Sequence, residues 1–420
     1  MAKIVKVVGR QVFDSRGNPT VEAEVFLSNK IKASAIVPSG ASTGAFEAYE
    51  LRDGNKNYFL GKSVLGAVNN INTIINKNLK KIDSGKQKKI DQILLDLDGT
   101  ENKKKLGANS LLAVSLAVSK AEAISKKKEL YQHLGKKFLL PKPLMNIING
   151  GAHADNNLRV QEFMIRPDSA KNFMEAIEKS FLVIQNLKKI LLSKNLSINV
   201  GDEGGFAPLI NSNEEALDLI VEAIEKSKLK PGIDISICLD VAANELINKD
   251  GYYSLNSSKF ISVDESINYY KNLVSKYPIK SIEDPFAEDD WNAWSRLTKE
   301  IGKSVQIVGD DLFVTNVKRL KKGIKEKSAN SILIKVNQIG TLTETLNVID
   351  LAKKNNFSTI ISHRSGDTED TFIADLAVAT QSTQIKTGSL ARSERVAKYN
   401  RLLRIEEQLG KTSKIARILL

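Results

Sequence analysis

Two hydrophobic patterns follow one another along the chain. In residues 20–28 and 31–39, apolar and polar positions alternate, which is typical of antiparallel strands with one buried face. A helical pattern follows, and its longest run, residues 109–135, begins with Asn109 as the expected N-cap and ends at Gly135. These elements predict a small α+β unit at the start of the chain.

The pattern changes at the stretch LPKPLMN, which contains Pro141 and Pro143. Proline disfavours continuation of the helix before it, so this stretch is the best candidate for a linker. We therefore place a domain boundary here, with an N-terminal α+β domain in residues 1–140 and a second domain in residues 141–420.

The second domain repeats a short apolar strand that ends in a polar residue and is followed by a helical segment. The residues at these strand ends are Asp240, Glu283, Asp310, Lys335, His363 and Lys386. After the first interval they are 23 to 28 residues apart, which is close to the length of one βα unit. The fold class is therefore α/β, with a barrel of strands whose carboxyl ends bring these polar residues to one rim.

Three of the strand ends are carboxylates: Asp240, Glu283 and Asp310. Two like charges about 4 Å apart repel by roughly 4 kcal/mol at an effective dielectric constant near 20, so we expect a cation between them. Carboxylate oxygens without thiolates favour a hard ion, Mg²⁺ before Mn²⁺ or Ca²⁺. A single acid of this kind is more often a helix N-cap or a surface residue, and a strand-end lysine such as Lys335 more often reaches out to water. The succession of acids around one rim favours a metal site over these simpler interpretations.

The segment SHRSGDTED indicates an anion site at the same rim. Arg364 offers a planar fork of donors, and Ser365 adds a hydroxyl. The alternative is an ion pair of Arg364 with Asp367 or Glu369. His153 lies in the glycine-rich loop NGGAHADNN, where a lone histidine is more often a simple hydrogen-bonding residue.

The composition is that of an ordinary soluble globular protein. The 420 residues are 42% hydrophobic and 26% charged, and Cys238 is the single cysteine, which excludes an intrachain disulfide and favours a reducing compartment. The first residues lack the hydrophobic region of a signal peptide, and the longest apolar stretch, residues 111–118, is too short to span a membrane. We therefore expect a cytoplasmic location.

The net charge of +13 raises the question of nucleic-acid binding. The basic residues occur in short runs with acidic neighbours, and no aromatic residues interleave with them as base-stacking platforms. We interpret them as solvated helix faces, so no nucleic-acid partner is expected. The positive field would still attract small polyanionic substrates.

Motifs along nearly the whole chain resemble those of the enolase family. They are DSRGNPTVE, PSGASTG, NGGAHADNN with QEFM, NVGDEGGFAP, SIEDPFAEDDW, GDDLFVTN, LIKVNQIGTLTE, SHRSGDTEDTFIADLAVA and QIKTGSLARSERVAKYNRLLRIEE. The resemblance implies an eight-stranded TIM-like barrel whose first two strands are unusually paired, and a smaller N-terminal domain that supplies an active-site loop. It also implies a hydro-lyase, phosphopyruvate hydratase, which reversibly dehydrates 2-phosphoglycerate to phosphoenolpyruvate in glycolysis and gluconeogenesis.

The resemblance implies two Mg²⁺ ions, the second of which binds only with substrate. Asp240, Glu283 and Asp310 match the ligands of the tighter ion, and Ser42 matches a loop ligand of the second. Removing a proton next to the substrate carboxylate puts a second negative charge on that group, and only concentrated positive charge lowers this barrier. The two ions and Lys386 would provide that charge.

The same motifs assign the proton chemistry. Lys335 matches the general base, and Glu203, with Glu162 beside it, matches the acid that protonates the leaving hydroxyl; His153 is a further candidate catalytic residue. A lysine base must be neutral, which needs a pKa depressed by about three units from about 10.4. The residues that match the substrate-binding set are Gln161, His153, Glu162, Lys335, His363, Arg364, Ser365 and Lys386.

Two alternatives stay open from the sequence. A sugar-acid enzyme of the enolase superfamily would share the carboxylate triad but differ in its base motifs and N-terminal loops. A role in binding host or surface proteins through exposed lysines, with a secreted or cell-surface pool, would be additional to catalysis. The family resemblance also implies a homo-oligomer, either a dimer or an octamer of dimers.

Overall fold

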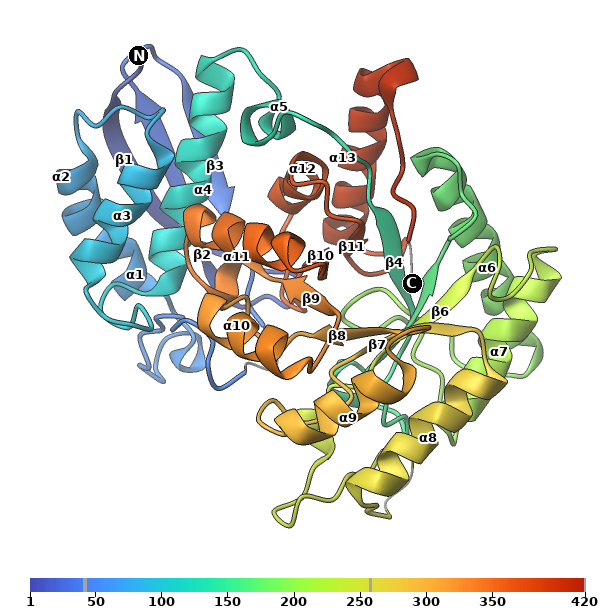
Figure 1. Cartoon of the computed structure of the whole chain (residues 1–420). Coiled ribbons are helices and arrows are strands. Elements are labelled where there is room, and N and C mark those ends of the chain that lie inside the picture. The colour runs from blue at the N-terminus through green and yellow to red at the C-terminus, as the bar shows by residue number, and fades with distance from the viewer. Residues whose placement is uncertain (41–43, 257–258, 419–420) are drawn as a thin grey trace.

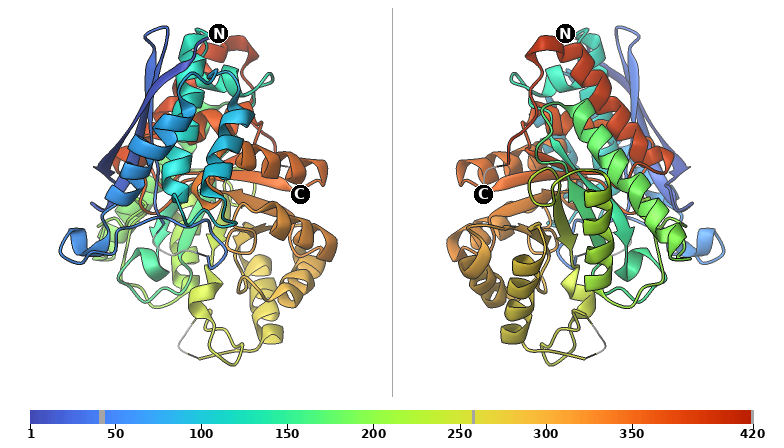
Figure 2. Two further views of the ribbon diagram at one scale, coloured as in Figure 1. Left: turned by 90° about the vertical axis from the view of Figure 1, so that its left-hand side faces the viewer. Right: turned by 90° about the vertical axis from the view of Figure 1, so that its right-hand side faces the viewer.

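The computed structural model describes residues 1–40, 44–256 and 259–418. An α+β unit of sheet and helices packs against one side of a closed barrel that is surrounded by helices (Figure 1). The two side views show that the sheet lies on the outside of the molecule, with its helices between it and the barrel or beside it (Figure 2).

The N-terminal sheet is antiparallel with the strand order β1-β2-β3. Its strands are β1 (Ile4–Phe13), β2 (Pro19–Leu27) and β3 (Lys32–Ile36). In β2 the alternate residues Val21, Ala23 and Val25 are fully buried, because this face packs on a long helix, α4. The helices are α1 (Leu65–Asn70), a π-helical turn (Ile71–Ile75), α2 (Asn76–Leu79), α3 (Gln87–Asp98), α4 (Ala108–Ser125) and α5 (Leu130–Leu134).

The single helix expected over residues 109–135 is two helices, α4 and α5. The break has a local cause: Glu129 and Gln132 form a capping box that starts α5 as a new helix. Asn109 is not the N-cap of α4 but lies inside its first turn. Its side-chain amide instead binds the backbone of Leu51, accepting from the N–H at 3.2 Å and donating to the carbonyl at 3.0 Å.

Eight strands form the closed barrel in the order β10-β11-β4-β5-β6-β7-β8-β9, which confirms the predicted fold. They are β4 (Lys142–Asn149), β5 (Glu162–Arg166), β6 (Ser236–Asp240), β7 (Ile279–Glu283), β8 (Gln306–Gly309), β9 (Ser331–Ile334), β10 (Ser358–Ser362) and β11 (Gln384–Lys386). β5 is antiparallel to both of its neighbours, and the other pairs are parallel. The stretch expected as a linker is not one, because residues 142–146 of it, Pro143 included, already belong to β4.

Helices cover the outside of the barrel (Figure 1). They are α6 (Phe173–Ser193), α7 (Asn213–Lys226), α8 (Val263–Lys276), α9 (Trp291–Ile301), α10 (Val317–Glu326), α11 (Leu342–Lys354), α12 (Phe372–Ala379) and α13 (Ser393–Leu409). Several begin at side-chain caps, for example Asn172, Ser212 and Thr341, each of which accepts from the backbone N–H three residues on. Among the described residues, no helix is long and apolar enough to cross a lipid bilayer.

The interior of the barrel holds the only thiol of the sequence. Cys238 is fully buried in a cluster with Leu144, Met164, Val308, Leu333 and Ile360. Burial raises the pKa of this thiol to about 12, so the reactive thiolate is scarce at neutral pH.

We expect a thiol reagent such as 5,5′-dithiobis(2-nitrobenzoic acid) to leave the native protein unmodified at pH 7. In denaturant the same reagent should modify one thiol per chain, because unfolding exposes Cys238. The released chromophore measures both reactions. Rapid stoichiometric modification of the native protein would contradict this packing of the barrel interior.

Candidate active site at the barrel rim

Residues that the sequence places at strand ends come together in one pocket. Asp240 and Lys386 end β6 and β11, while Asp310, Lys335 and His363 directly follow β8, β9 and β10. The pocket also contains side chains from the loops and from β5, and its lining is His153, Gln161, Glu162, Glu203, Asp240, Ala242, Asp284, Asp310, Asp311, Lys335, Ser362, His363, Arg364, Ser365 and Lys386.

Lys386 lies among three buried carboxylates. Its Nζ is 2.8 Å from both Asp240 Oδ2 and Glu283 Oε1 and 3.1 Å from Glu162 Oε1. Burial alone would lower the pKa of this lysine, but the attraction of the carboxylates, Asp240 first, raises it well above its ordinary value. Lys386 is therefore a permanent positive charge in the pocket.

The rim carboxylates fit a bound cation. Asp240 and Glu283 are paired in the register of neighbouring parallel strands. Burial, and then the charge of Asp240, raise the pKa of Glu283 well above its ordinary value, so one lysine does not fully relieve the repulsion. Because all these donors are oxygens, a hard divalent metal ion matches the site.

Lys335 forms an ion pair with Asp310. Burial would lower the pKa of Lys335, but the charge of Asp310 outweighs burial and raises it. The backbone around this pair is held by Thr315, whose Oγ1 accepts from Lys335 N at 2.9 Å and donates to Gln338 Oε1 at 2.8 Å. Gln338 Nε2 in turn donates to Asp310 Oδ1 at 2.9 Å.

Asp284 positions the neighbouring acids. Its two oxygens accept from the backbone N–H groups of Asp310 and Asp311, both at 2.9 Å. Asp284, Asp310 and Asp311 also have carboxylate oxygens within 4.8 Å of one another. Burial, and then the charge of Asp310, raise the pKa of Asp311 to about 7, which again reflects crowded negative charge.

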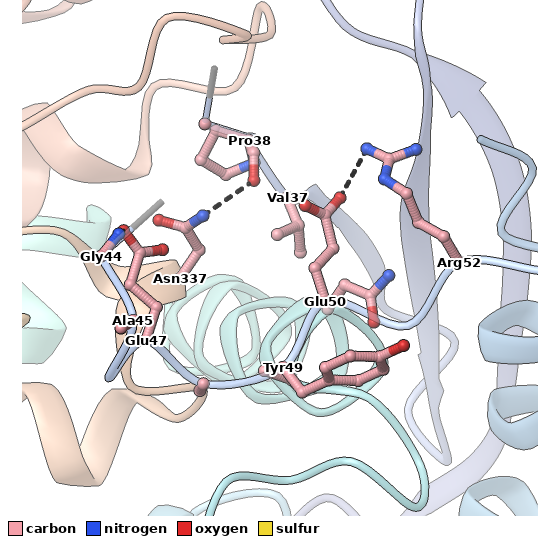
Figure 3. Close-up of a pocket in the computed structure, with 13 residues that line it drawn as sticks. Val37, Pro38, Gly44, Ala45, Glu47, Tyr49, Glu50, Arg52 and Asn337 are labelled. Carbon is pink, nitrogen blue, oxygen red and sulfur yellow. Dashed lines mark hydrogen bonds and ion pairs between the residues drawn. The ribbon is translucent and has the colours of Figure 1, made fainter. Parts of the chain in front are cut away.

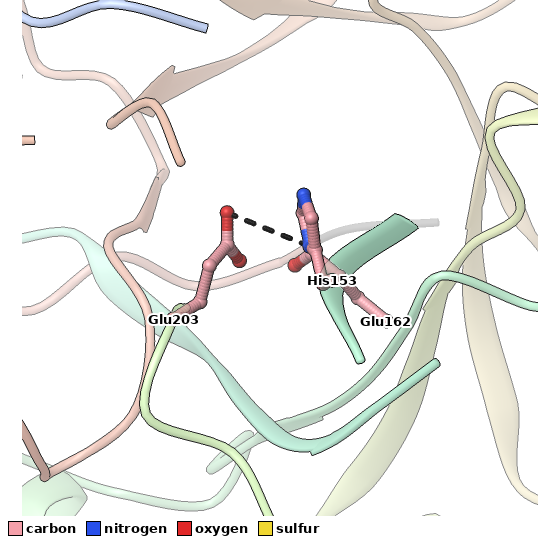
Figure 4. Close-up of side chains that lie close together, drawn as sticks. All are labelled: His153, Glu162 and Glu203. Carbon is pink, nitrogen blue, oxygen red and sulfur yellow. Dashed lines mark ion pairs between the residues drawn. The ribbon is translucent and has the colours of Figure 1, made fainter. Parts of the chain in front are cut away.

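A second cluster joins one imidazole to two carboxyl groups (Figure 4). His153 Nδ1 is 3.7 Å from Glu162 Oε1 and 3.8 Å from Glu203 Oε1, and His363 Nε2 approaches Glu203 Oε1 to 3.3 Å. Burial and the charge of Glu203 raise the pKa of Glu162 well above its ordinary value. Burial would raise the pKa of Glu203, but His363 and His153 outweigh this effect and lower the pKa well below its ordinary value. The raised pKa favours a protonated Glu162, and the lowered pKa favours an ionised Glu203.

Arg364 binds a carboxylate from the N-terminal part of the chain. Its NH1 and NH2 groups donate to Glu47 Oε2 and Oε1 at 2.9 and 3.1 Å, and NH1 also donates to Asn337 Oδ1 at 3.1 Å. Asp367, an alternative partner in the sequence, instead lies 3.2 Å from Lys398. The arginine therefore already holds an anion in the geometry that suits a phosphate or carboxylate.

A larger cavity of about 380 Å³ lies next to this arginine pair, between the N-terminal loop and the barrel (Figure 3). Asn337 spans the two parts by donating to the carbonyl of Pro38 at 3.2 Å, and Glu50 pairs with Arg52 at 2.7 Å. The lining of this cavity lacks the cluster of acids, imidazoles and lysines found at the rim, so we assign the chemistry to the smaller rim pocket.

Most residues that line the rim pocket are named in the sequence analysis, and some contacts around them are not. Ser42 lies outside the described residues. Glu47, Asp284, Gln338 and Thr315 were missed, because each acts through a partner that is distant in sequence or through a backbone group. The doubled acid in SIEDPF was a visible signal for Asp284.

A closed α/β barrel with this rim defines a metal-assisted acid–base enzyme. Residues 4–134 match the family described as "Enolase, N-terminal domain", and residues 137–418 match "Enolase, C-terminal TIM barrel domain". The chain is 64% identical over 420 residues to the enolase of Pelagibacter ubique (strain HTCC1062), with both chains fully covered. The chain belongs to the enolase family. It is therefore a metal-dependent hydro-lyase that reversibly dehydrates 2-phosphoglycerate to phosphoenolpyruvate, the enolase step of glycolysis.

Proposed function

We propose that the rim pocket carries out this dehydration with Lys335 as the general base and Glu203 as the general acid. The observation that supports this assignment is that the two residues lie in one pocket with different partners, Lys335 beside Asp310 and Glu203 beside two histidines. Lys335 would take the proton from carbon 2, and Glu203 would protonate the hydroxyl that leaves carbon 3. Because the pKa of Glu162 is raised and that of Glu203 is lowered, Glu162 would hold the proton and pass it to Glu203, with His153 beside both.

We propose two Mg²⁺ ions as the cofactor, with Asp240, Glu283 and Asp310 holding the first and Ser42 contributing to the second. When bound, Mg²⁺ stabilises the negative charge that develops on the substrate carboxylate. Asp310 would then serve as a metal ligand instead of the partner of Lys335. Lys335 would lose the attraction that raises its pKa, which favours the neutral amine that a base requires.

The remaining rim residues would bind the substrate. Arg364 and Ser365 would bind the phosphate, which has to displace Glu47 from the guanidinium group. Lys386 would remain charged and stabilise the substrate carboxylate together with the metal. The other lining residues in this proposal are Gln161, His153 and His363.

Removal of the metal should abolish turnover. Exhaustive chelation should stop the formation of phosphoenolpyruvate from 2-phosphoglycerate, measured by its absorbance, and added Mg²⁺ should restore it. The thermal midpoint should also fall on chelation, because a cation that binds only the folded state stabilises it. Full activity after chelation would contradict the metal assignment, and recovery with Ca²⁺ but not Mg²⁺ would contradict the choice of ion.

We further propose that the domains divide between residues 140 and 141 and that the N-terminal domain supplies the active-site loop. The bond from Asn337 to Pro38 and the Glu47–Arg364 pair support the second point, since both join the N-terminal part to barrel residues that follow β9 and β10. We also propose that the protein is a homodimer or an octamer of dimers and that it is cytoplasmic. The basic surface would have an additional protein-binding role. Light scattering of the purified protein would measure the oligomer.

A further inference from the structure

Arg395 lies in the first turn of α13, against the loop that carries His363 and Arg364. Its side chain is fully buried. NH1 donates to His363 Nδ1 at 2.5 Å and to the carbonyl of Arg364 at 2.6 Å, while NH2 donates to the carbonyls of Ser365 at 2.6 Å and Asp202 at 3.1 Å. One guanidinium group therefore connects the loop after β10 with the loop that carries Glu203.

The contact with His363 determines where the histidine carries its proton. A guanidinium group has only donors and keeps its charge at every accessible pH. The Nδ1 atom that faces Arg395 must therefore be an acceptor without a hydrogen. A neutral imidazole whose Nδ1 accepts has its hydrogen on Nε2. A doubly protonated ring would place an N–H group against an N–H group of Arg395.

The other nitrogen of His363 faces the pocket. Nε2 is buried without a hydrogen-bond partner among the described residues in this geometry and lies 3.3 Å from Glu203 Oε1, while the backbone N–H of His363 donates to the carbonyl of Lys386 at 2.9 Å. The ring is thus held between Arg395 on one side and Glu203 on the other. It presents a donor, not a lone pair, to the reacting groups.

We propose that Arg395 is a positioning residue that holds His363 as the neutral Nε2–H tautomer, so that His363 is a fixed hydrogen-bond donor toward Glu203 and the substrate. This proposal deepens the proposed function, because it rests on Glu203 as the acid. It also excludes His363 as a general acid or base in the working pH range, since its ring neither gains nor loses a proton there.

The charges around His363 support a neutral ring. Glu203 and Asp367 face it as carboxylates, and Arg395 faces it as a cation. Burial, together with Arg395, lowers the pKa of His363 to about 4 against the opposing pull of Glu203. His363 therefore stays uncharged across the neutral range.

The first test measures the tautomer directly in the intact wild-type protein. The sequence contains three histidines, so two-bond ¹H–¹⁵N spectra of protein labelled with ¹⁵N in the imidazole rings should show few signals, and a His363→Gln variant assigns the one in question. We expect the Nε2–H pattern from about pH 5.5 to 8.5, without metal or substrate. An Nδ1–H pattern, or an imidazolium near pH 6.5, would overturn the proposal. Because no turnover is involved, this outcome is separate from that of the proposed function.

The second test compares two substitutions of Arg395. Arg395→Met removes the donor and one of the two causes of the lowered pKa, so the pKa of His363 should rise, and the pH profile of kcat should gain an acidic limb. We expect kcat to fall at least about 10²-fold, since a wrong tautomer of an active-site histidine is costly. Arg395→Lys keeps a donor and should keep the Nε2–H signature and the wild-type pH profile, at lower activity.

Arg401 provides a matched control on the same helix. It forms an ion pair with Asp375 at 2.5 Å and with Glu129 at 2.8 Å, away from the pocket. Arg401→Met should lower the thermal midpoint without changing the His363 spectrum or the pH profile. If Arg395→Met keeps the Nε2–H tautomer and the wild-type profile, Arg395 has only a structural role. If Arg395→Met does not fold, the Arg395→Lys and wild-type spectra still decide the question.

Discussion

Glu203→Gln should form almost no phosphoenolpyruvate from 2-phosphoglycerate yet still exchange the proton of carbon 2 with D₂O. The reason is that proton removal and hydroxide loss are separate steps, and the variant keeps the base, Lys335, while losing the acid. Lys335→Ala should do neither, because it lacks the base of the first step. General acid–base assistance is commonly worth about 10²- to 10⁴-fold, so each variant should lose at least that much turnover. Mass spectrometry of the recovered substrate measures the exchange.

A surface ion pair of the same residue types serves as the control. Lys271 and Glu300 lie 2.8 Å apart, each with a side chain 45% exposed, so Lys271→Ala and Glu300→Gln should leave both reactions unchanged. Circular dichroism should show intact folding of all four variants. Exchange that persists in Lys335→Ala and disappears in Glu203→Gln would reverse the two roles.

Arg364→Ala should lower kcat/KM by about 10²- to 10³-fold, which corresponds to roughly 3–4 kcal/mol of lost transition-state stabilisation. It should also lower the free energy of unfolding by about 3–5 kcal/mol, because Glu47 would remain buried without its cationic partner. Steady-state kinetics and chemical denaturation measure the two effects.

The double variant Arg364→Ala with Glu47→Gln separates binding from stability. Removing both charges should recover most of the lost stability but none of the lost kcat/KM, since the phosphate ligand is still missing. Lys318→Ala, at a lysine whose side chain is 80% exposed, is the control for general loss of positive charge and should have little effect. Recovery of turnover in the double variant would reassign Arg364 to a purely structural pair.

The barrel rim was predictable because each strand end has a local pattern. A short apolar run followed by a polar residue marks Asp240 or Lys335 without knowledge of any partner, and the strands then bring these residues together. Contacts between distant residues have no such pattern. Glu47 and Arg364 are separated by 317 positions, and neither position indicates the other.

Competition between local signals explains why one helix was predicted over residues 109–135 where the structure has two. The hydrophobic spacing of residues 109–135 continues through the break, but Glu129 and Gln132 satisfy each other's backbone groups and begin a second helix. The protonation of Lys335 is a related case. A lysine base needs a lowered pKa, and burial acts in that direction, but the partner Asp310, which only the fold brings into contact, raises the pKa of Lys335.

The reversed direction of β5 determines which chain segments reach the rim pocket. A strand that runs toward the opposite rim leaves its amino end, Glu162, in the rim pocket. β5 ends at the opposite rim, where β6 also begins, and the chain between them runs to the rim of the pocket and back through two helices, α6 and α7, that lie beside each other (Figure 1). The turn between these helices, residues 194–212, therefore reaches the catalytic rim and carries Glu203 there. A single inverted strand thus gives the pocket an additional loop, and both carboxyl groups of the acid cluster depend on that inversion.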